Sequence, residues 1–267
     1  MNSRRRIPAN LILFGLIAIV ASVGFVRLGF WQLDRHLEVQ HSNESINAKL
    51  VLEPLQLTAV AVHSLDMDSL LWRRVEFSGR WDFDREVVIR SRARSGTPGI
   101  HVVTPLQLDS ERSGGIGYGR SVLVLRGWLP SPNPAIAELA AARDEASVSP
   151  GSPRLGLVRA SRAGNGAPMI NLGSDSSAVP SYAAIDVQLI AGDDDEIFPF
   201  FLQLLPDDTQ DASRSGQPYP VALPALDNGP HLIYMIQWFA FALITIVGST
   251  VFIRRERRRL AIQETPC

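Results

Sequence analysis

Histidines are the side chains of this sequence best suited to bind a metal or to transfer protons near neutral pH. The chain has five of them: His36, His41, His63, His101 and His231. They form no H-x-x-x-H or H-E-x-x-H pair, and none accompanies a G-x-S-x-G motif. The carboxylates likewise show no spacing that singles out an acid–base couple. We therefore predict no catalytic site and no enzymatic activity.

His231 differs from the other histidines because it stands at the start of a long apolar segment. A polar ionisable group is costly there unless it has a partner. At 100° per residue, one small and polar helix face carries His231, Tyr234, Met235, Trp238, Ala242, Thr245 and Ser249. Two interpretations stay open: an interfacial residue bonded to backbone or headgroups, or an axial haem ligand through neutral imidazole. If His231 is a haem ligand, Tyr234 and Trp238 would supply aromatic walls for the macrocycle.

Two apolar segments, one near each end of the chain, could position this residue. Leu232–Ile253 carries no charge and would span about 33 Å as a helix, enough to cross a membrane. The run Pro8–Val26 would span about 28 Å, and Gly15, Ala18 and Ser22 form a stripe of small residues along it. Small stripes let transmembrane helices approach closely, so we expect the two helices to pair through these faces.

Arginine clusters flank both apolar segments on their terminal sides, within residues 4–6 and 254–259. The positive-inside rule then places both termini in the cytoplasm, with Trp31 and Trp238 near the outer interface. A cleaved signal peptide, with Ser22 or Gly24 before the cleavage site, is the alternative for the first segment. We predict a multi-pass protein of the plasma (cell) membrane: cytoplasmic tail 1–9, transmembrane helix 10–30, extracytoplasmic domain 31–230, transmembrane helix 231–253 and cytoplasmic basic tail 254–267.

The central region is acidic, because Asp and Glu outnumber Arg and Lys between Leu28 and Pro230, although the formal net charge of the whole chain is only −1. Nucleic acid binding needs a basic face that neutralises phosphates, so we exclude nucleic acid as a partner and expect the lipid bilayer instead. The sole cysteine, Cys267, excludes an intrachain disulfide and a thiolate metal cluster.

Runs of β-branched and alternating residues predict that the central domain is mainly β, with a few helices, in an α+β arrangement. Arg74–Trp81 and Glu86–Arg92 are predicted to form a hairpin joined by Asp82–Arg85. Further strands are expected at Val102–Thr104, Ser121–Trp128, Leu155–Ser161 and Phe198–Leu205.

Helices and loops are predicted between these strands. Asn133 and Pro134 indicate a helix start, with the helix running to about Arg143, and Ser181 is expected to cap a helix over Tyr182–Ala191. Gly114–Gly119 lies between two strands and favours a hairpin loop over a dinucleotide-binding turn. The remaining segments are expected to be polar connections: Glu145–Pro153, the acidic turn Asp193–Glu196, and Pro206–Pro220.

Arg126 interrupts the most apolar predicted strand, on the face shared with Val122 and Val124. A charge in such a place needs a carboxylate partner or a contact between the domain and the membrane. We therefore expect a structural or partner-binding role for Arg126 rather than a catalytic one.

Four stretches of the chain carry distinctive motifs. Leu28–Arg35 reads LGFWQLDR, Gly79–Trp81 reads GRW, Val103–Leu106 reads VTPL and is followed by VLRGWLP at Val124–Pro130, and His231–Phe239 reads HLIYMIQWF. In order and spacing they resemble the Surfeit locus protein 1 family, whose signatures are LGxWQ…R, VTP, N-R-G-W-[VI]-P and HLxYxxQWF. The resemblance covers nearly the whole chain.

The motif residues of interest are Trp31, Gln32 and Arg35 in the first motif, and Arg126, Gly127 and Trp128 in the third. Two departures of this chain from the family pattern replace a polar or basic residue. Leu125 stands where Asn is usual, and Glu38 and Val39 occupy the region where a Lys usually follows the first motif.

The resemblance implies an assembly factor for haem-copper terminal oxidases, with the catalytic subunit of cytochrome c oxidase as partner. It also implies haem a as cofactor, with His231 as iron ligand, and haem a synthase as a further candidate partner. A cofactor-free scaffold that stabilises an oxidase assembly intermediate is the alternative, and an enzyme of haem modification is a third hypothesis with little support from the residues.

Overall fold

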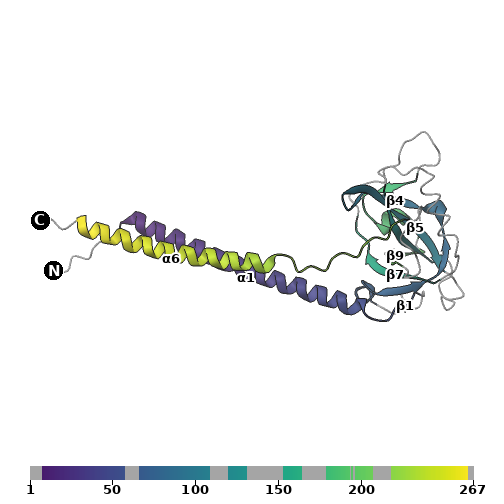
Figure 1. Cartoon of the computed structure of the whole chain (residues 1–267), viewed down its shortest axis with the longest axis horizontal. Helices are drawn as coiled ribbons and strands as arrows, with labels where there is room; N and C mark the ends of the chain where they lie inside the picture. The colour runs from purple at the N-terminus through teal and green to yellow at the C-terminus, as the bar shows by residue number, and fades with distance from the viewer. Residues whose placement is uncertain are drawn as a thin grey trace, which may run out of the picture. The chain divides into compact units, whose positions relative to one another are not determined.

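A computed structural model describes residues 8–57, 66–108, 120–130, 153–163, 179–192, 194, 196–206 and 218–263 (Figure 1). The chain divides into two compact units, a helical unit of Met1–Ser45 with Ala225–Cys267 and a sheet unit of Ile46–Pro224. Some predicted features lie outside the described residues: His63, the loop 114–119, the helix 133–143, most of 145–153 and 206–220, Asp193, and both chain termini with Arg4–Arg6 and Cys267.

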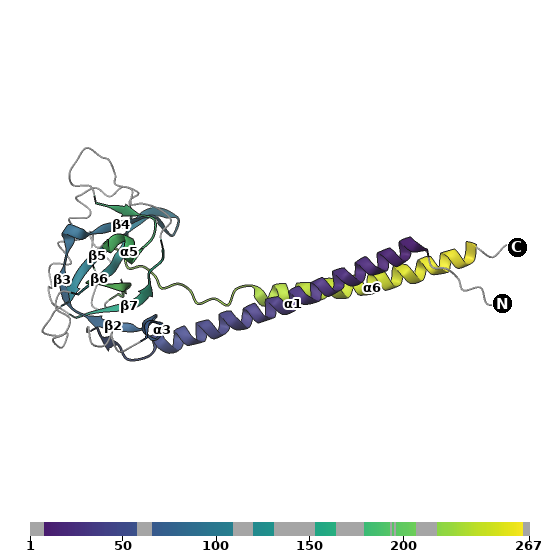
Figure 2. The ribbon, with the colours of Figure 1, turned by 180° about the vertical axis from the view of Figure 1, so that it is seen from behind.

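Two long helices, α1 (Ala9–Leu50) and α6 (His231–Gln263), run side by side in both views (Figures 1 and 2). Both are long and apolar enough to cross a membrane. Large apolar side chains such as Ile12, Leu16 and Ile233 are more than half exposed on them. The α1 helix continues far beyond its apolar segment, because the polar stretch after it forms contacts between successive turns, such as Gln40 to Glu44.

The helices meet through the small-residue faces that the sequence predicts. Ala18 and Ser22 of α1 and Ala242 of α6 are buried. At Gly29, an added Cβ would lie 2.7 Å from the ring of Phe239, so a larger residue would require the ring or the helix to shift. The predicted pairing of the two helices is therefore confirmed.

The sheet unit consists of short strands and helical turns. In chain order they are β1 (Leu55–Gln56), α3 (Met67–Leu70), β2 (Arg74–Phe77), β3 (Gly79–Trp81), the 3-10 helix η1 (Phe83–Arg85), β4 (Val87–Arg94), β5 (Thr97–Leu108), β6 (Ser121–Leu129), β7 (Arg154–Ala160), β8 (Ser181–Tyr182), α5 (Val187–Ala191) and β9 (Ile197–Leu204).

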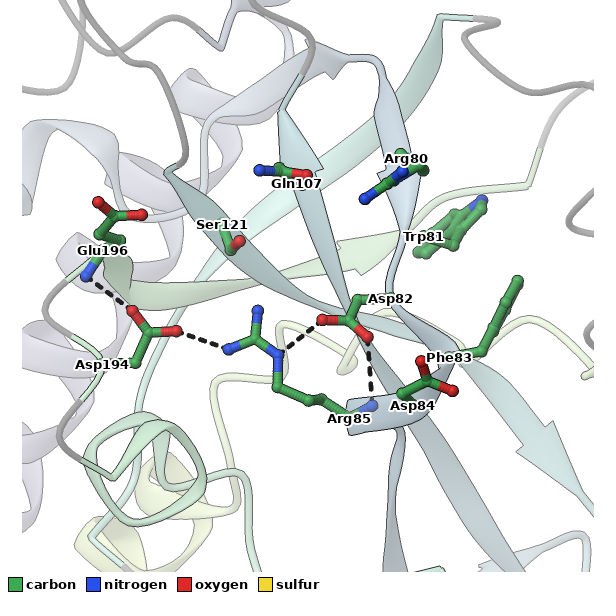
Figure 3. A pocket seen from close by; sticks show the side chains of 10 residues that line it. All are labelled: Arg80, Trp81, Asp82, Phe83, Asp84, Arg85, Gln107, Ser121, Asp194 and Glu196. Carbon is green, nitrogen blue, oxygen red and sulfur yellow. Dashed lines mark hydrogen bonds and ion pairs between the residues drawn. The ribbon is translucent and has the colours of Figure 1, made fainter.

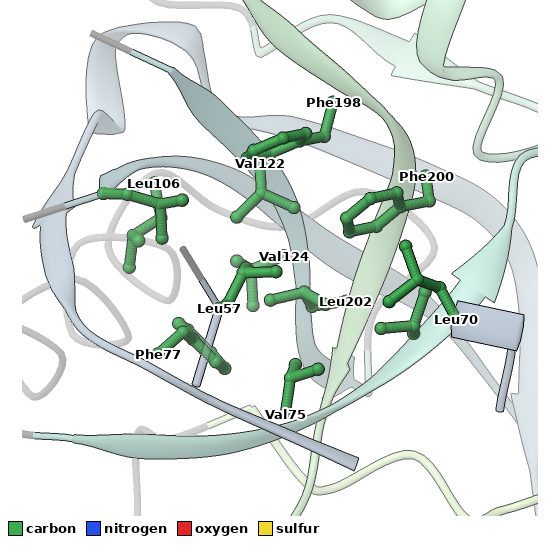
Figure 4. Packing of buried hydrophobic residues seen from close by; sticks show 12 residues of the cluster. Leu57, Leu70, Val75, Phe77, Leu106, Val122, Val124, Phe198, Phe200 and Leu202 are labelled. Carbon is green, nitrogen blue, oxygen red and sulfur yellow. The ribbon is translucent and has the colours of Figure 1, made fainter. Parts of the chain in front are cut away.

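The strands form one mixed sheet in the order β1-β2-β7-β9-β6-β5-β4-β8, with β3 also paired to β5. The centre of the sheet, β6, is buried along its whole length. Val122 and Val124 on one face join a cluster with Phe198, Phe200 and Leu202, whose side chains point toward one another in Figure 4. Leu123 and Leu125 on the other face join a second cluster. Both faces of β6 are therefore packed, as the apolar run Val122–Leu125 requires.

Most predicted strands are confirmed, but two local predictions are wrong. The expected hairpin does not form: β3 and β4 both pair with β5, which at 12 residues is long enough to accept them at different positions. The helix near Ala191 is capped by Asp186, whose carboxylate accepts the backbone N–H of Leu189 at 3.2 Å. Ser181 instead lies in β8 beside Val88 of β4.

His101 is a polar residue in the middle of this sheet. It lies on β5, opposite Ile89 of β4 and Trp128 of β6. Burial, which is the larger cause, and the positive charge of Arg92 together lower the pKa of His101 to about 4. The folded sheet unit therefore holds this histidine neutral.

This pKa predicts a pH-dependent stability. Between pH 6.5 and 4 the unfolded state binds a proton at His101 that the folded state does not, so the free energy of unfolding should fall as the pH falls through this window. The His101 contribution should reach up to about 3 kcal/mol. Chemical unfolding of the full-length protein in detergent, followed by tryptophan fluorescence, should show this slope reduced in His101→Gln. Equal slopes in both proteins would contradict the assignment.

Candidate functional site

The turn before α6 positions His231 against α1. Asp227 accepts a hydrogen bond from the backbone N–H of Gly229 at 2.9 Å, and Gly229 adopts a positive φ of 67°. The side-chain amide of Asn43 on α1 donates to Oδ1 of Asn228 at 2.9 Å. The turn is thus tied to α1 directly before the helix that begins at His231.

Gln32 of α1 is the hydrogen-bonding partner of His231. The Nδ1 atom of His231 lies 2.9 Å from Oε1 of Gln32, a residue 199 positions earlier in the chain. Two separate motifs, Trp31–Gln32 and His231–Phe239, therefore meet in space. The second ring nitrogen, Nε2, lies beside Gly229, where an added Cβ would come within 3.3 Å of it. A side chain at position 229 would therefore crowd this edge of the ring.

Aromatic rings pack against one another between the helices about two turns, or roughly 10 Å, along the axes from this pair. Phe25 stacks on Trp238 with ring centroids 5.8 Å apart, and Phe241 meets Trp238 edge-on at the same distance. Tyr234, predicted as a second wall, is instead 47% exposed. The structure therefore brings Trp238 into an aromatic layer with Phe25 and Phe241, and leaves Tyr234 outside it.

The other polar residues of the first motif have separate surroundings. Trp31 is 58% exposed. Arg35 forms an exposed ion pair with Glu38 at 3.0 Å, so the glutamate that departs from the family pattern neutralises the motif's arginine. One turn after Gln32, the Nδ1 atom of His36 is buried and has no hydrogen-bond partner among the described residues. His41 is exposed.

His231 is not part of a cluster of metal-ligating side chains among the described residues. Within the described ranges, no three His, Cys, Asp or Glu side chains gather to hold a metal ion. A metal at His231 would therefore need further ligands from a cofactor, as iron has in haem. Sequence reasoning selected His231 but missed Gln32 as its partner and Phe25 as the ring packed on Trp238.

Arg126 in the sheet unit has the carboxylate partner that its burial requires. It is the extra residue of a β-bulge, because Val102 and Val103 of β5 face Gly127 and Leu125. Its Nη1 lies 3.1 Å from Oε2 of Glu86, and the two side chains are 5% and 0% exposed. The hydroxyl of Thr104 donates to the same oxygen at 2.7 Å. Sequence reasoning demanded a carboxylate here but did not identify Glu86.

Gly127 and Trp128 of β6 contact the segment Pro218–Tyr219, which follows β9 in the chain. Trp128 and Tyr219 exchange two backbone hydrogen bonds of 2.7 Å. A Cβ at position 127 would lie 2.6 Å from Pro218 and from the backbone oxygen of Tyr219. The guanidinium of Arg94 lies over the rings of Trp128 and Tyr219. The motif therefore has a structural role within the sheet unit.

A polar cleft of about 670 Å³ opens beside β3 and η1 (Figure 3). Across it, Arg85 bonds Asp82 and Asp194, each at 2.6 Å. The hydrogen bond from Arg85 holds the pKa of Asp194 below its usual value, and the bonds to Asp82 and Asp194 raise the pKa of Arg85. The cleft therefore offers ion pairing and hydrogen bonding. Its described lining is Arg80, Trp81, Asp82, Phe83, Asp84, Arg85, Gln107, Ser121, Asp194 and Glu196.

The sequence of this chain matches a protein family model and several individual proteins. Residues 19–243 match the model of the SURF1 family, a range that includes Gln32 and His231. An uncharacterized SURF1-like protein of Mycobacterium tuberculosis is 26% identical over 97% of this chain and 90% of its own length. Surfeit locus protein 1 of Arabidopsis thaliana is 34% identical over 39% of this chain and 30% of its own length. A SURF1-like protein of Monosiga brevicollis is 25% identical over 86% and 83%.

The buried ion pair between Arg126 and Glu86 should make single substitutions far more destabilising than the double substitution. Arg126→Met or Glu86→Leu alone should destabilise the protein by about 3–5 kcal/mol, because each leaves one buried charge without compensation. The double variant should recover most of this loss. Unfolding free energies and protein abundance in the membrane fraction measure the effect.

Arg85→Met is the matched control, because Arg85 also forms ion pairs but its side chain is 47% exposed. It should cost less than about 1 kcal/mol. A stable, abundant Arg126→Met protein would show that Arg126 is not the structural residue described above.

Proposed function

This chain belongs to the SURF1 family, and we propose that it is an assembly factor for haem-copper (cytochrome c) oxidase. In this proposal it binds haem a as cargo and aids its insertion into the catalytic subunit, and it catalyses no reaction of its own. The family resemblance supports the oxidase as partner, with haem a synthase as the source of the cargo. The single observation that carries the haem proposal is the contact between His231 and Gln32 at 2.9 Å.

The chemistry of this contact fits a haem ligand. A histidine that ligates a metal commonly donates its other ring N–H to a carbonyl or carboxylate oxygen. Gln32 offers such an oxygen to Nδ1, and Gly229 carries no side chain that would crowd the Nε2 edge. Trp238, with Phe25 and Phe241, supplies an apolar aromatic surface about two helical turns further along α6. His231 is thus the residue that would hold the iron, and Trp238 would contact the macrocycle.

Exposed apolar surface on both helices supports integration in the plasma membrane. Ile19, Val20, Leu243 and Ile244 are each more than 60% exposed, which is costly in water and favourable in a bilayer. The arginines beyond each apolar segment favour cytoplasmic termini. The sheet unit would then lie on the extracytoplasmic side.

A cofactor-free scaffold is the second candidate function. The observation that favours it is that the His231–Gln32 hydrogen bond joins α1 to α6 directly, without a cofactor. In this case the pair would stabilise the helix packing, and the protein would hold an oxidase assembly intermediate without carrying haem.

His231→Ala separates the two candidates. Co-produced with haem a synthase and purified in detergent, the wild-type protein should show a haem a band in redox difference spectra at near-stoichiometric yield. His231→Ala should lose most of this band but still insert in the membrane, because the apolar segment Leu232–Ile253 is intact. Oxidase assembled in the mutant should be low or poor in haem a.

The exposed His41 on α1 provides a matched control, and His41→Ala should retain its haem. His36→Ala tests ligation by two histidines, since the buried Nδ1 of His36 has no hydrogen-bond partner among the described residues. We expect it to retain haem as well. A full haem spectrum in His231→Ala would remove the ligand assignment, and colourless wild-type protein that co-purifies with the catalytic subunit would select the scaffold.

The proposed topology predicts where reporters work. A reporter that is active only outside the cytoplasm should be silent when fused after Cys267 and active when inserted within residues 207–216. The physical reason is that the arginine clusters lie on the terminal side of both apolar segments. A fusion after Glu264 should behave like the one after Cys267. Activity at Cys267 would overturn the orientation or the two-span arrangement.

A further inference from the structure

We infer that Gln32 is a positioning residue that holds His231 in a single tautomer, with its proton on Nδ1 and its free electron pair on Nε2. The tautomer assignment stands on the helix contact itself. The role of the electron pair in binding haem iron rests on the proposed function.

The atoms that face each other determine the tautomer. Nδ1 of His231 and Oε1 of Gln32 are 2.9 Å apart, a usual hydrogen-bond distance. An amide oxygen only accepts hydrogen bonds, so the ring nitrogen must donate. A neutral imidazole carries one proton, and a proton on Nδ1 leaves Nε2 as an acceptor or a metal ligand.

The packing of the helices keeps Gln32 at this distance. One turn before it, Gly29 lets the ring of Phe239 approach α1 closely. Beyond it, Asn43 bonds Asn228 in the turn that leads to α6. These contacts hold α1 and the start of α6 together on both sides of Gln32. The pair is also partly buried, so water competes less for the hydrogen bond.

The Nε2 edge of the ring lies beside a glycine. Gly229 stands beside Cδ2 and Nε2 of His231, and any larger residue there would crowd them at 3.3 Å. The residue also has a φ of 67°, which favours glycine. Gln32 therefore engages Nδ1, while a side chain at position 229 would crowd Nε2.

The same hydrogen bond should tune a metal bound at Nε2. An acceptor on the remote N–H orients the ring and raises the basicity of the ligating nitrogen. Loss of such a partner typically weakens metal binding about 10-fold to 100-fold. A more basic imidazole stabilises ferric over ferrous iron, so a stronger acceptor at position 32 should lower the midpoint potential and a missing one should raise it.

Nitrogen NMR of the haem-free protein tests the tautomer directly. In full-length protein labelled with ¹⁵N-histidine, the His231 signals are identified by their loss in His231→Ala. Wild type should show one protonated Nδ1 and one unprotonated Nε2. Gln32→Met, which keeps the length but removes the acceptor, should lose this single tautomer. Gln40→Met is the control, because Gln40 bonds the exposed Glu44 on the same helix. An unchanged tautomer in Gln32→Met would overturn the inference.

Titration with ferric haem b and haem a tests the consequence. Gln32→Met should bind about 10-fold to 100-fold more weakly than wild type and have a higher midpoint potential, and Gln32→Glu should have a lower potential. Gln40→Met should match wild type. Wild-type affinity and potential in both Gln32 variants would remove Gln32 from the ligand site and leave the proposed function intact. Unchanged haem in His231→Ala would instead refute the proposed ligand, while the NMR result would still decide the tautomer.

Discussion

A polar ring at the start of an apolar helix must find a hydrogen-bonding partner, and the arrangement of the helical unit satisfies this requirement. His231 cannot leave its position, because the helix begins there and the preceding turn is tied to α1 through Asn228. Gln32 meets it at 2.9 Å only because the helices approach closely at Gly29 and along Ala18 and Ser22. The small residues, the aromatic layer and the motif glutamine therefore depend on one another.

The sheet unit solves a similar problem in its own core. Arg126 interrupts an otherwise apolar strand, and the bulge at this position directs it to Glu86, with Thr104 on the same carboxylate. The rings of Trp81 and Phe83 cover the guanidinium at 5.5 Å. Both motif residues, His231 and Arg126, are thus polar groups that bond one side chain far away in the sequence, Gln32 and Glu86 respectively. In one the hydrogen bond engages a single ring nitrogen, whereas in the other the charge is fully enclosed.

Local chemistry made part of this structure predictable. Helix periodicity placed His231, Trp238 and Ala242 on one face because that geometry needs no tertiary information. Long-range partners were not predictable in the same way. The sequence demanded a carboxylate for Arg126 and a partner for His231, yet Glu86 and Gln32 are identified only by strand register and helix packing. The expected hairpin failed for the same reason, since nothing local shows that β5 accepts both β3 and β4. The extent of α1 was missed because its helix outlasts its apolar segment.

Hyperfine spectroscopy of the haem-loaded protein labelled with ¹⁵N-histidine measures whether the iron binds a histidine nitrogen. If His231 is the ligand, ferric haem a should couple to one imidazole through Nε2, the remote nitrogen should carry an exchangeable proton, and this coupling should disappear in His231→Ala. Haem a that shows no histidine coupling, or a coupling that survives the substitution, would contradict this assignment.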